Sequence, residues 1–414
     1  MDPGQYTNLL EALAQVPDPR KARGKQHEWP IVLAVLCAAV ASGQRSVRAI
    51  AQWAKEHEAE LIQHLQPTRL RLPSAATLYR VMRSVDVASV EDHLTRFSYG
   101  QEAAAARAKP KAVEAARAKP KAQDKRVQDK QKKPQLQGRQ RFVGQSVDGK
   151  ELRGARAHGR PICLVSLVRH GTGTVLAQRA VDQKSNEITA VPQLLGGRDL
   201  RGTVTTMDAL LTQRAIAQQI VGGGGHYLMG VKANQPELYL ATEELFASPP
   251  WLAHEQQANY RCYTKVEKGH GRLEKRTLES SGALREYLRK DLRWPGAEQV
   301  MRRTCRRVIM ATGEVSEEVK YGVTSLKWEQ ANAAELEELW RGHWTIENQV
   351  HHVRDVTMGE DANQMRIGNA QQVLAAVRNA VLNLMRFKGW TNVADGLRHY
   401  GAFVHRALAL VTSL

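Results

Sequence analysis

The segment RFVGQSVDG (141–149) decides the fold, because it has the composition of a β-strand and ends at an aspartate, Asp148. Two more strand-like segments follow, PICLVSLVRH (161–170) and GTVLAQRAV (173–181), and the glycines between them indicate a tight turn. The three segments therefore predict a meander of adjacent strands.

Helix-like and strand-like segments alternate after this meander. A helical pattern at 186–197 ends in glycine, and a strand-like segment at 202–209 ends near Asp208. A second helical pattern at 210–225 is followed by a strand-like segment at 226–232. This order, continued by a long polar stretch and then by helices, is that of the ribonuclease-H-like α/β fold.

The two strand-end aspartates can meet in space although sixty residues separate them in the sequence. Parallel strands that are connected through helical crossovers end at one edge of a sheet, so we expect Asp148 and Asp208 to be neighbours. Two divalent ions about 3.5–4 Å apart can activate a nucleophile and stabilise a leaving oxygen on phosphorus. Because Mg²⁺ prefers carboxylate oxygens, the pattern indicates phosphodiester chemistry that needs one further carboxylate.

The late segment GHWTIENQVHHVRDV (342–356) has the periodicity of an amphipathic helix. With about 3.6 residues per turn, Glu347, His351 and Arg354 lie on one face, beside an apolar face that can dock on the sheet. The carboxylates that compete as third ligand are Glu347, Asp355, Glu360 and Asp361. From these residues alone, a metal ligand and a solvated helix face are equally good interpretations of Glu347.

The composition divides the chain into three regions. We expect a small all-α domain at 1–98, a basic low-complexity linker at 99–141, and the catalytic domain at 142–414 with a mainly β insertion at about 236–327. In the first region the helix expected after Ser74 carries two arginines, as a helix-turn-helix-like DNA-binding unit would. A helical accessory domain with solvated arginines is the alternative.

The expected linker carries much of the positive charge. The chain has 60 Lys and Arg against 42 Asp and Glu, a net charge of +18, which suggests a polyanionic partner such as nucleic acid. Residues 101–141 hold 13 Lys or Arg and 4 Asp or Glu, so they supply +9 of this total, and ARAKPKA occurs twice in them. With few bulky apolar residues, this stretch is expected to be flexible or partly helical, either a solvated spacer or a non-specific phosphate contact.

Several other classes of protein are disfavoured. The four cysteines lie far apart with no CxxC pair, so we expect buried free thiols in a reducing cytoplasm. The longest apolar run, at 30–41, is too short to span a bilayer, and the N-terminus lacks the pattern of a signal peptide. The glycines at 222–225 lack the Lys-Ser/Thr of a P-loop, so no nucleotide cofactor is expected.

Several ordered segments carry a resemblance to a known family. They include VDGKELRGAR, GTVTTMDALLTQRAIAQQI, YLMGVKANQPEL, GHGRLEKR and GHWTIENQVHHVRDVTMGEDANQMR. Together they resemble the ISAs-type insertion-sequence transposases, which include the H-repeat-associated proteins and are a branch of the DDE transposases. The resemblance extends from Asp18 to about Arg386 and leaves out only 101–141.

The resemblance implies a bacterial, cytoplasmic, nucleoid-associated DNA transposase. It implies that Asp148, Asp208 and Glu347 are the catalytic carboxylates and hold two Mg²⁺ or Mn²⁺ ions. The implied partners are double-stranded DNA, both as terminal inverted repeats and as target, and a second copy of the chain in a homodimeric synaptic complex, with no membrane. Two rivals stay open: a domesticated or inactive DNA-binding regulator, and a nuclease of the same fold without strand transfer.

Relatives carry Tyr, Arg and Lys at fixed helical offsets around the glutamate, where this chain has Trp340, His343 and Arg354. Trp340 is expected in the domain core rather than stacked on a base. Basic and polar side chains near the expected site, or on the helical region, are candidate DNA contacts. They are Lys150, Arg153, Lys184, Asn186, Lys232, Asn234, Arg272, Arg276, His343, His351, Arg354, Arg80 and Arg83. For Lys150 and Arg153 an ion pair at the surface is the alternative.

Overall fold

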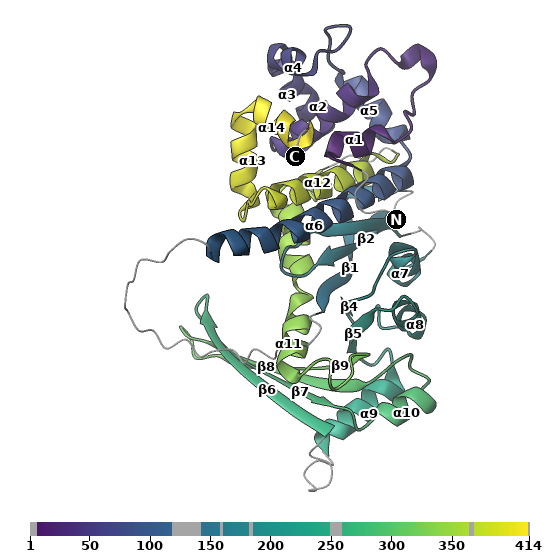
Figure 1. The fold of residues 1–414 in the computed structure, drawn as a ribbon, viewed down its shortest axis with the longest axis vertical. Coiled ribbons are helices and arrows are strands. Elements are labelled where there is room, and N and C mark those ends of the chain that lie inside the picture. Colours follow the sequence, from purple (N-terminus) through teal and green to yellow (C-terminus); the bar gives the residue numbers. More distant parts are fainter. Residues whose placement is uncertain are drawn as a thin grey trace.

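A computed structural model describes residues 6–117, 142–157, 160–181, 185–248, 259–363 and 368–412. One large mixed sheet runs through the molecule (Figure 1). The N-terminal and C-terminal helices gather at one end of this sheet, and two long β-hairpins extend at the other end.

The first half of the sheet holds the five strands that the sequence predicts. They are β1 (Val143–Ala157), β2 (Arg160–Arg169), β3 (Val175–Ala180), β4 (Thr203–Met207) and β5 (His226–Val231). Their spatial order is β3-β2-β1-β4-β5. The first three strands are antiparallel to one another, and β4 and β5 run parallel to β1. The crossover helices α7 (Glu187–Leu195) and α8 (Arg214–Gly222) pack against each other on one side.

Strand β1 does not end at Asp148, which corrects the sequence-based expectation. It continues because β2 stays paired with it well beyond that residue, through Leu152↔Ile162. The parallel pairing of β1 with β4 does stop there, at Val147↔Met207. Asp148 is therefore the first residue of β1 beyond the part that pairs with β4.

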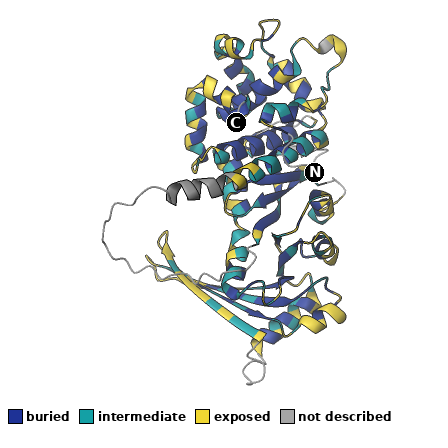
Figure 2. Ribbon diagram, viewed as in Figure 1, coloured by how far each residue is buried: buried dark blue, intermediate teal, exposed yellow. Residues whose placement is uncertain are grey.

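The second half of the sheet is formed by the expected insertion. Its strands are β6 (Tyr260–Gly269), β7 (Arg272–Ser281), β8 (Gln299–Ile309) and β9 (Val315–Thr324), with α9 (Pro236–Ala247) and α10 (Arg285–Lys290) beside them. Because β9 pairs antiparallel with β5, the insertion extends the same sheet to nine strands. The outermost strand β6 is exposed or half-buried along its length, whereas the first part of β8 is buried (Figure 2).

The N-terminal region is helical, as predicted. It comprises α1 (Leu9–Ala14), α2 (Trp29–Ala41), α3 (Val47–Glu56), α4 (Glu58–Leu65), α5 (Ala75–Ser84) and α6 (Val87–Arg117). Ser46 and Ser74 are N-caps, because their side chains accept hydrogen bonds from the backbone N–H groups of Ala49 and Thr77. Helix α6 crosses the expected boundary between residues 98 and 99, so part of the expected linker is helical.

One hydrophobic core joins the two ends of the chain. It unites α1–α6 with α12 (Ala370–Phe387), α13 (Val393–Ala402) and α14 (Val404–Thr412). Helix α12 is buried along most of its length, between the N-terminal helices and β3 (Figures 1 and 2). The helical region is thus packed directly onto the first half of the sheet.

Two predictions about the chain as a whole can be compared with the structure. The cysteines are free thiols, but only Cys37 and Cys305 are buried, whereas Cys262 is exposed because it lies on the edge strand β6. Among the described residues, no helix combines the length and the apolar character that crossing a membrane requires.

Candidate active site

Asp148 and Asp208 lie side by side where β1 and β4 separate. Val147 is the register partner of Met207, and each aspartate is the next residue of its chain segment. Asp208 opens the loop to α8, where its Oδ1 accepts a hydrogen bond from the backbone N–H of Leu211 over 3.2 Å. The loop geometry therefore holds this carboxylate next to β1.

The segment that carries Glu347 follows α11 (Ala333–Gly342) and has π-helical turns in place of the expected regular α-helix. The turns cover η4 (Ile346–His351) and η5 (Val353–Thr357). Short π-helical stretches are frequent at functional sites, because the wider turn redirects side chains. Ile346 and Val350 are buried in the helical core, while Glu347 is exposed and its charge acts on Asp148.

Lys150 neutralises two of the other late carboxylates. Its ammonium lies 2.5 Å from Oδ1 of Asp355 and 3.4 Å from Oδ1 of Asp361. Lys150 is buried, so the expected phosphate contact is wrong for this conformation. The alternative of a surface ion pair holds for the exposed Arg153, whose Nε lies 3.7 Å from Oδ2 of Asp361. Neither Asp355 nor Asp361 is free to act as the third ligand.

Glu360 is neutralised as well. It is buried between Arg354, whose Nη2 lies 2.7 Å away, and Arg378, whose Nη1 lies 3.2 Å away. Among the described residues, no cation pairs with Glu347. Glu347 is thus the one of the four competing carboxylates whose charge the protein leaves uncompensated.

Glu187, which the sequence reasoning missed, is a fourth carboxylate beside the two aspartates. It begins α7, and a side chain at Gly149 would bring its Cβ within 2.1 Å of Glu187 Oε1. The thiol of Cys163 donates to the same oxygen over 3.4 Å. Two features of the sequence could have indicated that Glu187 belongs to the site: a glycine directly after Asp148, and an acidic residue at the start of a helix.

The carboxylates repel one another. Burial, followed by the charges of Asp208 and Glu187, raises the pKa of Asp148 to about 7, and Glu347 adds to the effect. Burial and the charge of Asp208 also raise the pKa of Glu187. An acidic group without a protein cation is a suitable environment for a divalent ion.

The donor set fits such ions by its chemistry, since carboxylate oxygens are the ligands that Mg²⁺ and Mn²⁺ prefer. In the part of the chain that the structure describes, no three acidic, histidine or cysteine side chains converge closely enough to hold one ion. The carboxylates that would hold a metal therefore lie near one another, but in this conformation they do not converge on one ion-binding position.

Two histidines of the late segment lie near the carboxylates, His351 buried and His343 half-buried. His351 Nδ1 lies 3.6 Å from Asp148 Oδ2, and burial, with help from Arg354 and Lys150, lowers the pKa of His351 to about 3. His343 Nδ1 lies 3.1 Å from Thr206 Oγ1, and its carbonyl accepts a hydrogen bond from Ser146. The imidazole of His351 is buried, so the DNA contact expected of it is wrong for this conformation, whereas the contact expected of the half-buried His343 stays a prediction.

Two arginines expected to contact DNA are also buried. Arg354 has no exposed side-chain surface, since Glu360 and the surrounding core enclose it. Arg276 pairs with Glu274 over 2.6 Å and with Glu337 of α11 over 3.3 Å. Both expectations are corrected, because each guanidinium is used within the protein.

The remaining candidate DNA contacts are at the surface where the structure describes them. Asn234 has its own partner, because its Nδ2 donates to the carbonyl of Ala209 over 2.6 Å and so ties the loop after β5 to the loop after β4. Lys184 lies outside the described residues. The other exposed candidates are Arg80, Arg83, Arg153, Asn186, Lys232 and Arg272.

Trp340 packs on the sheet, as expected of a core residue. A Cβ on Gly322 of β9 would lie 2.6 Å from its ring. The indole therefore occupies space that only a glycine leaves free, and α11 is held against β9 at this point.

The pH dependence of stability tests the electrostatics of Asp148. Its folded-state pKa of about 7 exceeds the ordinary value of 3.8, so between these values the folded state keeps a proton that the unfolded chain has lost. The stability of the metal-free protein should therefore fall as the pH rises through this window, and Asp148→Asn should weaken the fall. Thermal unfolding in a chelator, followed across this window, measures both; an unchanged profile in Asp148→Asn would contradict the assignment.

Replacing Glu187 by glutamine should lower the pKa of Asp148, because one of the charges that raises it is removed. The titration of the aspartate carboxyls, followed by carbon NMR of labelled metal-free protein, measures the shift. Glu338→Gln on exposed α11 surface is the control and should leave Asp148 unaffected. An equal response to both variants would show that Glu187 has no special relation to Asp148.

Comparisons with known proteins match the sequence of this chain to a family. The family model described as transposase DDE domain matches residues 131–384, and the model described as DDE_Tnp_1-associated matches residues 10–98. An uncharacterized protein from the dhlA 3′ region of Xanthobacter autotrophicus is 32% identical over 317 residues, which are 75% of this chain and 92% of that protein.

Relatives from Escherichia coli are named as transposases. The "Putative transposase YncI" of strain O157:H7 is 33% identical over 58% of this chain, and the "H repeat-associated putative transposase YhhI" of strain K12 is 32% identical over 58%. The matched regions cover 61% and 63% of those two proteins. A piggyBac transposase synaptic complex with hairpin DNA aligns with a TM-score of 0.40 at 9% identity, covering 97% of this chain and 77% of that one, a likeness too weak to decide anything.

Proposed function

We propose that this chain, which belongs to the DDE transposase family, cleaves DNA at the ends of a mobile element and joins the 3′-hydroxyl ends to target DNA. The observation that carries the proposal is the pairing of Asp148 and Asp208 at the point where β1 and β4 separate, with Glu347 as the uncompensated late carboxylate. The strand order β3-β2-β1-β4-β5 supports a ribonuclease-H-like catalytic domain.

Asp148, Asp208 and Glu347 are the residues that would hold the metal. When bound, two Mg²⁺ or Mn²⁺ ions supply Lewis acidity for the attacking and leaving oxygens. Without these ions, Asp148 keeps its proton up to a pH of about 7, because its pKa is raised to about that value. Hydrogen bonds from Ser146 to the His343 carbonyl and between Thr206 and the His343 ring tie the end of α11, just before the Glu347 segment, to β1 and β4.

DNA would approach the exposed face of this carboxylate group. Arg153, Lys232 and Arg272 are exposed cations on β1, after β5 and at the β6–β7 tip, and are suited to phosphate contacts. Arg80 and Arg83 offer further charge on α5. We propose that two copies of the chain act together, because two element ends must be brought to one target.

A joining assay tests the function. Labelled DNA that carries the sequences flanking the gene is incubated with the protein, a target plasmid and Mg²⁺. Cleavage followed by joining to the plasmid is the expected result. Binding without cleavage would favour a regulator, and cleavage without joining a nuclease; either outcome would overturn the proposal.

A further inference from the structure

Arg354 lies at the centre of a buried polar network behind the Glu347 segment. Its Nε donates to Glu360 Oε2 over 2.9 Å, and its Nη1 donates to Gln178 Oε1 over 3.1 Å. The backbone N–H of Glu360 donates to the carbonyl of Arg354 over 2.9 Å. Side-chain and backbone bonds thus close the end of the π-helical segment.

Gln178 of β3 links Arg354 to the N-terminal helical region. Its Oε1 also accepts from Asn379 of α12 over 2.8 Å, and its Nε2 donates to Glu91 of α6 over 3.2 Å. Gln178 is buried, as are Glu91 and Asn379. The amide orientation suits all three neighbours, because its oxygen faces donors and its nitrogen faces a carboxylate.

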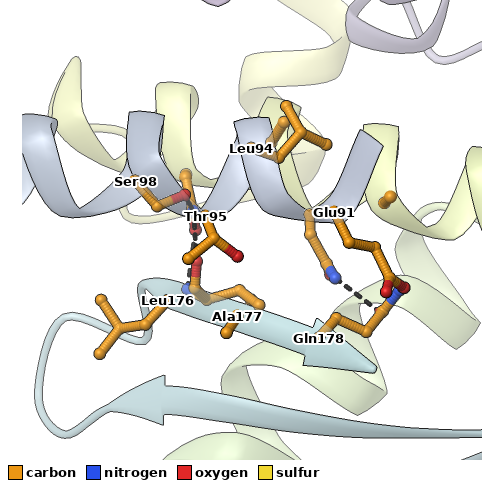
Figure 3. A pocket seen from close by; sticks show the side chains of 12 residues that line it. Glu91, Leu94, Thr95, Ser98, Leu176, Ala177 and Gln178 are labelled. Carbon is orange, nitrogen blue, oxygen red and sulfur yellow. Dashed lines mark hydrogen bonds between the residues drawn. The ribbon is translucent and has the colours of Figure 1, made fainter. Parts of the chain in front are cut away.

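Figure 3 shows this junction as the polar lining of a small cavity between α6, β3 and α12. The cavity has a volume of about 20 Å³, room for a single water molecule. At its other end Asn383 donates to Ser98 of α6 over 3.0 Å and to the carbonyl of Val175 over 2.8 Å. Helix α6, strand β3 and helix α12 are therefore joined by two sets of hydrogen bonds. The set around Gln178 is linked to Arg354, and the set around Asn383 is not.

A second tie runs from the N-terminal region to the same segment. The carbonyl of Arg45 accepts from Arg378 over 3.1 Å, and Arg378 in turn pairs with Glu360. Arg45 Nη2 donates to the carbonyl of Thr357, the last residue of η5, over 3.2 Å. The N-terminal helices thus hold the far end of the segment whose near end carries Glu347.

We propose that Arg354 is a positioning residue, which, through Gln178 and Glu91, fixes the π-helical segment that presents Glu347 and couples its placement to helix α6. The inference rests on the proposed function, in which Glu347 acts at the scissile DNA. It assigns to Arg354 a role inside the protein, since a guanidinium without exposed surface cannot reach a phosphate. Each nitrogen of the Arg354 guanidinium has a partner in this network, and a buried polar network restricts a segment to one arrangement, which is what a metal-binding carboxylate requires.

The test severs the link without touching a proposed ligand. Gln178→Met removes the bonds to Arg354 and Glu91 while keeping a side chain of similar length. Gln178→Glu separates the two links, because its carboxylate still accepts from Arg354 and Asn379 but has no N–H to donate to Glu91. Asn383→Leu is the matched control, since it removes bonds from the other end of the same junction.

Three quantities are measured on the full-length protein. Amide hydrogen exchange of residues 346–357 reports the order of the Glu347 segment, and anisotropy with a short duplex of random sequence reports DNA affinity and its salt dependence. The cleavage rate on flanking-sequence DNA is expected to fall about 100-fold in Gln178→Met, as misplacement of a reacting group does. Exchange at 346–357 should rise in the same variant, with affinity and salt dependence unchanged.

The outcomes separate the inference from its alternatives. Gln178→Glu should also raise exchange at 346–357 and slow cleavage, because the link to Glu91 of α6 is lost, and Asn383→Leu should lower the melting temperature without selective exchange at 346–357. Unchanged exchange at 346–357 in Gln178→Met would overturn the inference. So would a salt-dependence slope shallower by about one in Arg354→Lys, because that marks a lost phosphate contact. If the natural protein cleaves no DNA, the proposed function fails, yet the exchange measurement still decides the role of Arg354.

Discussion

Glu347→Gln is expected to abolish DNA cleavage and joining while DNA binding persists. The substitution keeps the size and the exposure of the side chain but removes the charge that the protein leaves uncompensated. Loss of a group that acts as a unit with other catalytic residues reduces rates by about 10³-fold or more. Single-turnover cleavage of labelled flanking-sequence DNA in Mg²⁺ measures the loss, and a gel-shift assay measures binding.

Two controls test whether the loss of activity depends on the position of Glu347. Glu338→Gln removes an exposed carboxylate from α11, the helix before the Glu347 segment, and should retain natural activity. Affinity for divalent ions, measured by titration calorimetry without DNA, should fall in Glu347→Gln and not in Glu338→Gln. Cleavage that survives Glu347→Gln would show that another carboxylate completes the site.

The order of elements and the nearness of the aspartates could be predicted because both depend on local patterns. Strand-like segments alternate with helical ones around Asp148 and Asp208, and parallel strands must end at a common edge. The end of β1 was placed wrongly, since the sequence does not show that β2 keeps pairing after β4 has stopped. Pairing partners belong to the assembled sheet, not to the strand itself.

The exposure of the basic residues could not be predicted, because a helical period shows which side chains share a face but not what covers that face. The helical period grouped Arg354 with Glu347 on one face, yet Arg354 is buried against Gln178 and Glu360 while Glu347 is exposed. Lys150 likewise meets Asp355, which is about two hundred residues away in the sequence. Long-range ion pairs of this kind decide between a DNA contact and a buried anchor.

Glu187 is a residue of the site that was not predicted from the sequence. The sequence placed it at the start of a helix without relating it to Asp148, and only the packing of α7 against β2 and β3 brings its carboxylate to Gly149. The pKa of Asp148 is sensitive to it, so the acidic group is larger than the three residues that a family resemblance implies. A site defined by electrostatics includes residues that a motif does not.

Removing the charge of Glu360 is expected to destabilise the fold more than any other single change to a described carboxylate. Arg354 and Arg378 both pair with it, at 2.7 and 3.2 Å, and all three side chains are at least 99% buried. Glu360→Ala would leave two buried guanidinium groups without a counter-charge, and breaking such a pair costs about 3–5 kcal/mol. Chemical denaturation monitored by tryptophan fluorescence gives the free energy of unfolding.

The exposed pair of Asp199 and Arg201 provides the control, since Asp199→Ala should leave the midpoint unchanged. A loss in Glu360→Ala no larger than that of Asp199→Ala would mean that the buried arginines do not depend on Glu360, and the segment carrying Glu347 would then need another anchor.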